Sequence, residues 1–301
     1  MASDSFIRRV AIVSPGEMGH AVGRTLREHG LDVFTCLAGR SERTRSLSRS
    51  AGLREVATLA DLVREADLIL SILVPSDAVS AALLLADAIR TAGTSPYVAD
   101  CNAVAPDAAA VMDAVLTAAG GRFIDASIIG FPPARGVVPR FYASGPHASA
   151  MSLLDGKGLE IVPLGDRVGQ ASGIKMCYAG LTKGTFALYY GVAMAAENMG
   201  LLSELCRELS HSQPHAHDQM KRHLPRLPAK AHRWIGEMEQ IAAALEHAGV
   251  TPRFHEAAAA VFRIVSRSPL GQETPETIDE SRTLEETIAA ITRQQMPPDP
   301  A

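Results

Sequence analysis

VAIVSPGEMGHAVGRTL, residues 10–26, runs from a short apolar segment through two glycines into a pattern with helical spacing. The spacing Ser14-x-Gly16-x-x-Gly19 matches the dinucleotide-binding fingerprint Gly-x-Gly-x-x-Gly except at its first position. The second glycine lets the backbone approach a pyrophosphate, and the third lets the helix pack closely on the strand. Serine is tolerated at the first position if its φ is negative. We predict that this loop binds a dinucleotide; the alternative is an ordinary turn from strand to helix.

Short apolar runs alternate with amphipathic stretches from residue 6 to about residue 130. This order predicts a parallel sheet with helices on both faces. Glycines stand where four helices should end in the left-handed conformation, namely Gly30, Gly52, Gly93 and Gly120. The alternation then gives way to long helical patterns. We predict an α/β fold with a Rossmann-type doubly wound parallel sheet in a dinucleotide-binding domain, residues 1–165, followed by an all-α substrate and dimerisation domain, residues 166–301.

The charge of the chain argues against polyanionic partners. The 301 residues carry a formal net charge of −4, with a pI near 6.2, so no basic field attracts nucleic acid or an anionic membrane. No apolar stretch has the length of a bilayer span, and the start of the chain shows no secretory signal. The four cysteines are dispersed without a Cys-x-x-Cys pair. We therefore expect a cytoplasmic protein with a small-molecule substrate and no nucleic-acid or membrane partner.

Five histidines crowd one region and suggest a metal site: His211, His215, His217, His223 and His232. Their spacing matches no ligand pattern that places two imidazoles and a carboxylate on one helical face. Prolines also interrupt the segment. We expect a solvated, irregular surface segment and no metal.

The end of the second predicted strand indicates which dinucleotide binds. Residues 36–38, Cys-Leu-Ala, carry no carboxylate that could hold a ribose 2′-hydroxyl. Arg40, Ser41 and Arg43 instead form a short basic loop with a hydroxyl, which suits a 2′-phosphate. The alternative is a solvated helix start, since Glu42 lies among the arginines. The sequence favours NADP(H) over NAD(H).

Lys175 lies inside an uncharged run at the start of the helical region. Gly169 and Gly173 remove side chains around it, so another group can approach the helix closely there. A lysine in a desolvated cleft can exchange a proton near neutral pH. The alternative is a lysine whose stem follows an apolar face while its ammonium group reaches water.

Several segments together resemble the β-hydroxyacid dehydrogenase superfamily, which includes 3-hydroxyisobutyrate and 6-phosphogluconate dehydrogenases. The glycine loop has Met18 before Gly19, LILSILVP stands in place of a cofactor-contacting strand and loop, and FIDASIIG stands where the family has Asp-Ala-Pro-Val-Ser-Gly-Gly. ASGIKMCYAGLTKG and RWIGEMEQIA are similar to the 6-phosphogluconate-dehydrogenase-like helical C-terminal domain of a largely uncharacterised branch. The order of these segments covers nearly the whole chain and is more specific than any one of them.

The resemblance assigns roles to individual positions. Lys175 matches the lysine that exchanges a proton with the substrate oxygen while hydride moves to or from the nicotinamide. Asn102 matches a residue that contacts substrate or the nicotinamide ribose, although an asparagine before Pro106 also suits a helix cap. Candidate substrate contacts are Asn102, Ser127, Gly130 and Tyr178; candidate cofactor contacts are Ser14, Gly16, Glu17, Met18, Gly19, Arg40, Ser41, Arg43, Val74, Pro75 and Asn102.

The chain departs from the family pattern at the expected substrate pocket. Ala179 replaces an asparagine one helical turn after the lysine, Ile129 replaces the serine of Ser-Gly-Gly, and Ser127 replaces the usual proline. Phe131 and two prolines follow at the edge. Because polar contacts are lost, we expect a substrate bulkier or less polar than hydroxyisobutyrate.

These features predict an NADP-dependent oxidoreductase that interconverts a hydroxyl and a carbonyl, with Lys175 as general acid/base. An imine reductase and a non-catalytic dinucleotide-binding protein are the alternatives. Retention of Lys175 favours oxygen substrates over imines, whereas Ala179 and Ile129 motivate the non-catalytic alternative. The resemblance also implies a homodimer that the long helix beginning near Gly169 helps to build, and the apolar length of this helix predicts burial on more than one side.

Overall fold

The computed structural model describes residues 7–274 and 277–293. The chain forms two compact units, Met1–Met176 and Cys177–Ala301. The predicted boundary after residue 165 coincides with the end of strand β8 (Glu160–Gly165), where the last strand of the first unit ends. The first unit itself extends further along, into helix α6 (Gln170–Asn198), because the first turns of that helix bond to the sheet.

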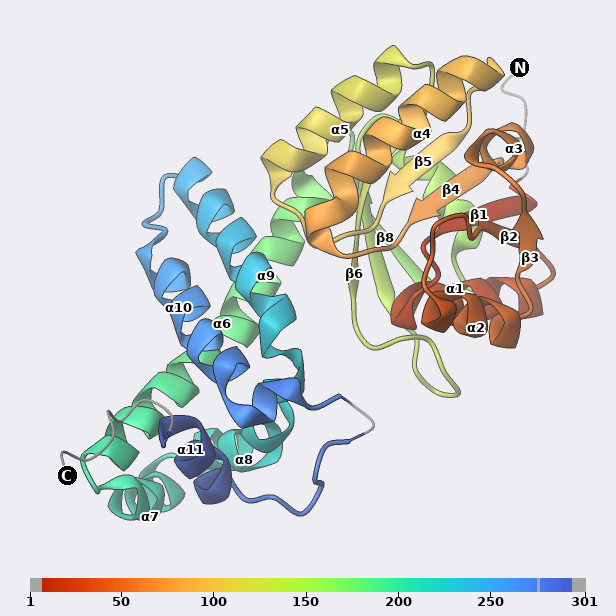
Figure 1. The fold of residues 1–301 in the computed structure, drawn as a ribbon. Helices are drawn as coiled ribbons and strands as arrows, with labels where there is room; N and C mark the ends of the chain where they lie inside the picture. Colours follow the sequence, from red (N-terminus) through yellow and green to blue (C-terminus); the bar gives the residue numbers. More distant parts are fainter. Residues whose placement is uncertain (1–6, 275–276, 294–301) are drawn as a thin grey trace. The chain divides into compact units, whose positions relative to one another are not determined.

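The first unit is built on one eight-stranded sheet with the order β3-β2-β1-β4-β5-β6-β7-β8 (Figure 1). All neighbouring pairs are parallel except β6 and β7, which are antiparallel. The strand order reverses direction between β1 and β4, which confirms the predicted doubly wound topology. The strands are β1 (Arg9–Val13), β2 (Asp32–Cys36), β3 (Arg54–Val56), β4 (Leu68–Ser71), β5 (Tyr97–Asp100), β6 (Arg122–Ile129), β7 (Arg140–Ser144) and β8.

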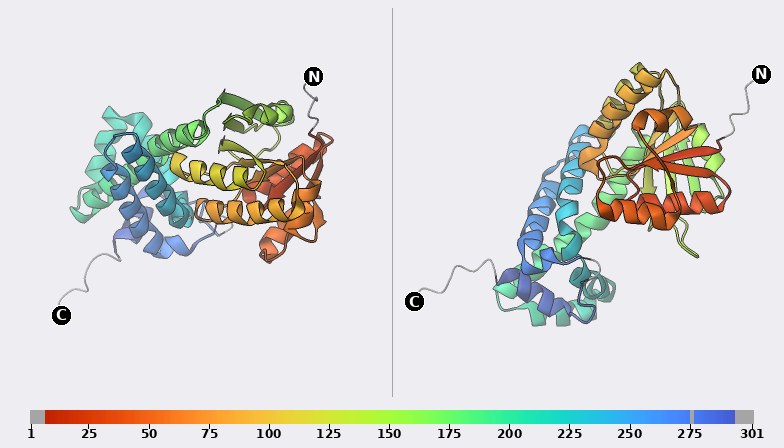
Figure 2. Two further views of the ribbon diagram at one scale, coloured as in Figure 1. Left: turned by 90° about the horizontal axis from the view of Figure 1, so that it is seen from above. Right: turned by 45° about the vertical axis from the view of Figure 1, so that its right-hand side comes forward.

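Helices cover both faces of this sheet (Figure 2). The helices of the first unit are α1 (Glu17–Glu28), α2 (Glu42–Ala51), α3 (Leu59–Glu65), α4 (Ala78–Ala92), α5 (Pro106–Ala118) and two 3-10 helices, η1 (Pro75–Asp77) and η2 (Ala148–Leu154). Side chains of α1, α2 and η2 form one hydrophobic cluster with the sheet, and those of α3, α4 and α5 form another. Val10 and Ile12 belong to the first cluster and Ala11 and Val13 to the second, so successive residues of β1 face opposite layers.

The four glycines predicted at helix ends all have positive φ: Gly30 at 85°, Gly52 at 69°, Gly93 at 63° and Gly120 at 94°. Gly52 and Gly93 are themselves the left-handed C-caps of α2 and α4. A glycine adopts this conformation without the steric cost that a Cβ brings. These positions mark where each helix ends and the chain turns toward the next strand.

All regular elements in the described part of the second unit are helices. Its elements after α6 are α7 (Leu202–Ser212), α8 (Pro214–His223), η3 (Leu224–Arg226), α9 (Pro228–His247), α10 (Arg253–Arg267), η4 (Pro269–Gln272) and α11 (Leu284–Thr292). Phe186, Trp234 and Phe262 form an aromatic cluster that joins α6, α9 and α10. The predicted all-α region is confirmed. Within residues 7–274 and 277–293, no helix combines the length and apolar character needed to cross a bilayer.

The histidine-rich segment is more regular than we expected. Pro214 and Pro228 stand in the first turns of α8 and α9, where proline's missing N–H costs nothing, so they begin helices instead of interrupting them. His223 packs against the Phe186 ring, and burial lowers its pKa. The expectation of an irregular segment was therefore wrong. The described residues contain no group of three His, Cys, Asp or Glu side chains that could hold a metal ion.

Candidate active site

The loop after β1 forms a tight turn into helix α1. Ser14 has a φ of +59°, and its carbonyl accepts a 2.7 Å hydrogen bond from the Gly16 amide. The condition stated for serine at this position, a negative φ, is therefore not met. Pro15 disfavours the right-handed helical conformation for the residue before it, and the turn uses the left-handed region instead. A non-glycine residue held there costs about 1–3 kcal/mol, and such strain is typical of ligand-binding loops.

Gly16 and Gly19 lie in different surroundings. A Cβ on Gly16 would meet only the Ser14 carbonyl oxygen, at 3.9 Å, so the space beside this residue is open. Gly16 is also the N-cap of α1, with no side-chain hydrogen bond to the helix N-terminus. A Cβ on Gly19 would lie 3.2 Å from the Ile12 Cγ2 atom and 3.3 Å from the Ser14 oxygen. The loop thus combines an open helix N-terminus with close helix–strand packing, which is what pyrophosphate binding requires.

Residues 40–43 lie at the start of helix α2. Ser41 is the N-cap of the helix, and its hydroxyl accepts a 3.3 Å hydrogen bond from the Thr44 amide. Glu42, the acid among the arginines, pairs with Arg49 at 2.5 Å. The helix-start interpretation is therefore correct for Ser41. Arg40 is half-buried on the short loop after β2, and Arg43 is exposed in the first turn of α2.

Asn102 is buried between the ends of strands β4 and β5. Its Oδ1 accepts a 2.7 Å hydrogen bond from the Leu73 amide, and its Nδ2 donates to the Ser71 hydroxyl at 3.2 Å and to Asp100 Oδ1 at 2.5 Å. Asn102 does not cap helix α5, whose N-cap is Ala105, so that alternative was wrong. The side chain instead supports the loop after β4.

The loop that Asn102 holds carries two of the predicted cofactor contacts. Val74 is exposed, and Pro75 is the first residue of η1. Both follow directly from Leu73, whose amide bonds to Asn102. Because β1 and β4 are neighbours, this loop and the loop after β1 lie at the same edge of the sheet, at the point where the strand order reverses. Ligands bind at this position in open α/β sheets.

Lys175 is anchored to the carboxyl end of strand β6. Its Nζ donates a 2.7 Å hydrogen bond to the Ile128 carbonyl oxygen, and the side chain is half-buried. Ser127, also on β6, is fully buried, and its hydroxyl donates to the Ala171 carbonyl of α6 at 2.8 Å. Gly130 follows with a φ of +129°. The structure therefore brings Lys175, Ser127 and Gly130 together at one strand end.

Tyr178 and Ala179 follow on α6 and face different ways. Tyr178 is exposed, with 48% of its surface accessible, whereas Ala179 is buried. The Tyr178 hydroxyl therefore does not take the place of the missing asparagine amide at position 179. The substrate contact predicted for Tyr178 depends on whether a ligand reaches the exposed side of the helix.

Sequence reasoning missed two acids in this region, Asp100 and Asp125. Both are buried, and they lie opposite each other in the register of β5 and β6. Burial raises the pKa of Asp100 to about 7, and the nearby Asp125 charge acts in the same direction. A signal was present, since an acid interrupts an apolar run in each strand: Asp100 is the last residue of β5, and Asp125 is the fourth residue of β6.

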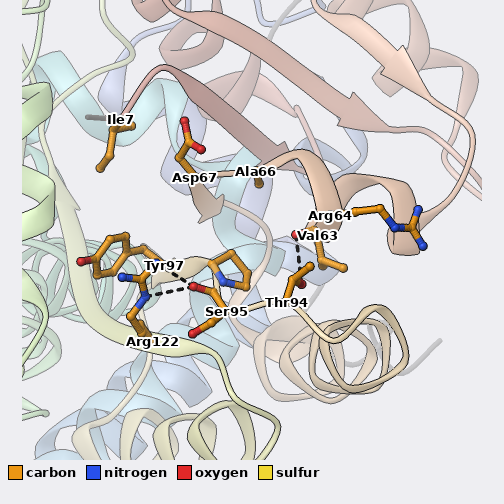
Figure 3. A pocket seen from close by; sticks show the side chains of 10 residues that line it. Ile7, Val63, Arg64, Ala66, Asp67, Thr94, Ser95, Tyr97 and Arg122 are labelled. Atoms are coloured by element: carbon orange, nitrogen blue, oxygen red, sulfur yellow. Dashed lines mark hydrogen bonds between the residues drawn. The ribbon is translucent and has the colours of Figure 1, made fainter. Parts of the chain in front are cut away.

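A cavity of about 380 Å³ lies near the start of strands β5 and β6, away from the loops described above (Figure 3). The Arg122 guanidinium stacks 3.7 Å above the Tyr97 ring and donates to the Ser95 carbonyl at 2.7 and 3.0 Å. Asp67, also at this cavity, accepts hydrogen bonds from the amides of Arg8 and Arg9. Because these polar groups bond within the protein, we do not assign the active site to this cavity.

Two family models match the chain. Residues 9–137 match the NAD binding domain of 6-phosphogluconate dehydrogenase, and residues 196–265 match a domain of unknown function, DUF1932. These matches confirm the resemblance to the β-hydroxyacid dehydrogenase superfamily that was drawn from the glycine loop and the strand segments. They agree with the predicted enzyme class, a pyridine-nucleotide-dependent dehydrogenase or reductase that acts on CH–OH groups.

Individual relatives show how far the likeness extends. An uncharacterised 28.5 kDa protein of Methanothermus fervidus is 26% identical over 205 residues, which are 68% of this chain and 77% of that protein. The conserved protein MTH1747, of unknown function and described as structurally similar to 3-hydroxyacid dehydrogenases, is 26% identical, with a TM-score of 0.64 over 86% of this chain and 96% of that one. A Mycobacterium tuberculosis 3-hydroxyisobutyrate dehydrogenase with L-serine has 15% identity and a TM-score of 0.67, covering 97% and 100% of the two chains, and shares the fold.

Proposed function

We propose that this protein is a member of the β-hydroxyacid dehydrogenase superfamily and an NADP-dependent oxidoreductase that interconverts a hydroxyl and a carbonyl, with Lys175 as general acid/base. The observation that carries the proposal is the 2.7 Å hydrogen bond from Lys175 Nζ to the Ile128 carbonyl. This contact holds an ammonium group at the carboxyl edge of the sheet, where the dinucleotide loops also end. A positioned lysine can donate a proton to a forming hydroxyl or accept one from an alcohol.

The residues present fit a dinucleotide. The open space beside Gly16, the uncapped N-terminus of α1 and the loop held by Asn102 supply backbone donors and room for phosphates. When bound, the nicotinamide supplies or accepts the hydride. The chain's own residues orient that ring, exclude water and move the proton at Lys175 Nζ.

An assay with a broad panel tests this function. Alcohols, ketones and imines are offered with NADPH, NADH and their oxidised forms. We expect turnover of carbonyl compounds larger or less polar than 3-hydroxyisobutyrate, because Ile129 and Ala179 supply no polar contacts at positions where the family has them. Turnover of only small β-hydroxy acids would contradict the substrate class. Cofactor binding without any turnover would support the non-catalytic alternative, and turnover of imines alone would support an imine reductase.

We infer a preference for NADP(H) from the loop after β2. Glu42 pairs with Arg49, so its carboxylate is drawn toward that residue. Arg40 on the loop and Arg43 in the first turn of α2 are the candidate partners of a 2′-phosphate. Replacing both arginines with alanine should weaken NADPH binding about 10- to 100-fold, since hydrogen bonds to a charged group contribute about 1.5–3 kcal/mol. NADH binding should change little. Fluorescence titration of both cofactors measures the two dissociation constants.

The matched control for the Arg40 and Arg43 double variant is Arg90→Ala. Arg90 is an exposed arginine on α4 that pairs with Asp87, and it lies outside the loop after β2. We expect wild-type affinity for both cofactors in this variant. Equal weakening of NADH and NADPH in the double variant would instead show that the two arginines contact no 2′-phosphate.

We also infer that the chain forms a homodimer through helix α6. Large apolar side chains recur along one exposed stripe of the helix, at spacings of three, seven and four residues: Tyr178, Leu181, Leu188 and Val192. Leu181 is 73% exposed and Leu188 is 51% exposed. Residues at this spacing share one side of a helix, and a self-complementary stripe suits a two-fold interface.

Replacing Leu181 and Leu188 with glutamate should convert the dimer to a monomer at micromolar concentrations, because two charges per copy would be buried without partners. Size-exclusion chromatography with light scattering measures the mass. Leu84→Glu, at a 57% exposed leucine of α4, is the control and should leave the dimer intact. A dimer that persists in the double variant would remove α6 from the interface.

The cysteines support a reducing compartment. Cys36, Cys101, Cys177 and Cys206 are all free thiols. Burial raises the pKa of the Cys101 thiol well above its ordinary value, so this cysteine packs as a neutral group. We infer a cytoplasmic location from these unpaired cysteines.

A further inference from the structure

A row of buried polar residues crosses the sheet beneath the candidate active site. The strand register pairs Ser71 with Asp100, Asp100 with Asp125, and Asp125 with Ser144, so the row spans β4 to β7. All four residues are at most 3% exposed. Strand interiors of this kind are usually apolar, and each buried polar group requires a hydrogen-bond partner.

One end of the row holds the loop after β4. Asn102 bonds to Ser71 and Asp100 through its Nδ2 and to the Leu73 amide through its Oδ1. These bonds fix the start of the segment that carries Val74 and Pro75.

The other end holds the first turn of helix α6. Asp125 Oδ2 accepts hydrogen bonds from the amides of Gly169 at 2.9 Å, Ala171 at 3.0 Å and Ser172 at 3.2 Å. It also accepts a 2.8 Å bond from the Ser144 hydroxyl, and Oδ1 accepts one from the Ser172 hydroxyl. A carboxylate on a neighbouring strand therefore satisfies the orphan N–H groups of the helix and complements its dipole.

Strand β6 contacts α6 at three successive places. Asp125 binds the helix N-terminus, the Ser127 hydroxyl donates to the Ala171 carbonyl at 2.8 Å, and the Ile128 carbonyl accepts from Lys175 Nζ at 2.7 Å. Asp125 fixes the first turn, and Lys175 follows on the next turn of the same helix. The position of the ammonium group therefore depends on how firmly the first turn is held.

We propose that Asp125 is a positioning residue that holds Lys175 at the end of strand β6 through the first turn of α6. The role for Lys175 in catalysis rests on the proposed function, whereas its placement by Asp125 does not.

The chain's few lysines allow a direct test. The sequence contains five, namely Lys157, Lys175, Lys183, Lys221 and Lys230. Acetic anhydride acylates only amines that are neutral and accessible to solvent. Peptide mass spectrometry after trace labelling therefore gives a rate for each lysine that rises with its accessibility and its neutral fraction. Asp125→Asn removes the negative charge and leaves one acceptor oxygen, so either the backbone N–H groups or the Ser172 hydroxyl meet the Nδ2 donor in place of an acceptor, which loosens the first turn. We expect the labelling rate of Lys175 to rise about threefold or more, with the other four lysines unchanged.

The matched control is Asp67→Asn. Asp67 also accepts two backbone amides, those of Arg8 and Arg9, and pairs with the Arg9 side chain, but it does so beside the other end of the strands. This variant should leave Lys175 labelling at the wild-type rate. Ser172→Ala removes one hydroxyl donor from Asp125 and keeps the carboxylate, and it should give a smaller rise in the same direction; it serves as the test if Asp125→Asn does not fold.

Unchanged Lys175 labelling in a folded Asp125→Asn variant, or in Ser172→Ala if Asp125→Asn does not fold, would overturn the proposal. A general rise at all five lysines would also overturn it, because that result would reflect loosening of the whole fold. Labelling requires no substrate, so the result does not depend on turnover. If labelling is unchanged while Lys175→Met abolishes turnover, the positioning role fails and the proposed function stands.

Discussion

Lys175→Met should lower kcat about 10²- to 10⁴-fold for any substrate that the wild-type chain turns over, because that is the usual contribution of a positioned general acid/base. Methionine keeps the length and most of the volume of lysine but cannot exchange a proton. The Nζ atom that it removes is the one held by the Ile128 carbonyl at the strand end. Steady-state kinetics on the best substrate of the panel measure the loss.

Two controls separate proton transfer from other effects. Lys221→Met makes the same substitution at an exposed lysine of α8 and should keep wild-type kcat. NADPH should bind to Lys175→Met with nearly wild-type affinity, since the glycine loop and the loop after β2 are unchanged. An undiminished rate in Lys175→Met would remove the lysine from the mechanism.

The fold could be predicted because its signals are local. The alternation of apolar runs with helical patterns predicted the doubly wound sheet, and Gly30, Gly52, Gly93 and Gly120 marked helix ends by the φ that only glycine adopts easily. The histidine-rich segment was misjudged although its signal was also local. Proline begins a helix as readily as it ends one, and Pro214 and Pro228 do the former.

The candidate site could be predicted only in part, because its internal bonds depend on strand register. Asp100 ends strand β5 and Asp125 lies in the middle of strand β6, and a register shift of one residue would place one of them on the opposite face. The role of Asn102 depends on the same register, since its partners Ser71 and Leu73 lie 31 and 29 residues earlier in the chain. Sequence alone placed Asn102 at the correct edge of the sheet but did not reveal these partners.

Asp100 should make the folded state less stable as pH rises from about 4 to about 8. Burial raises its pKa to about 7 in the folded protein, from the ordinary value of 3.8. Between these two values the folded state binds one proton more than the unfolded state, so the free energy of unfolding falls with increasing pH. The difference of about three pKa units corresponds to at most about 4 kcal/mol. The stabilising effect of the proton is complete below pH 3.8 and is lost once the pH exceeds about 7.

Asp100→Asn isolates this contribution, because asparagine resembles the neutral acid and does not titrate. Urea unfolding of both proteins at a series of pH values gives the difference in their free energies of unfolding. We expect the wild-type chain to lose stability relative to the variant as pH rises, by up to about 4 kcal/mol at about pH 8. Acids whose pKa is lowered in the folded state, such as Asp67, instead raise the free energy of unfolding as pH increases. Burial raises the pKa of Asp67, but the hydrogen bonds from the Arg9 side chain and the Arg8 amide lower it by more. Such acids are present in both proteins, so their contributions cancel in the difference. A difference that stays constant with pH would show that Asp100 is ionised throughout.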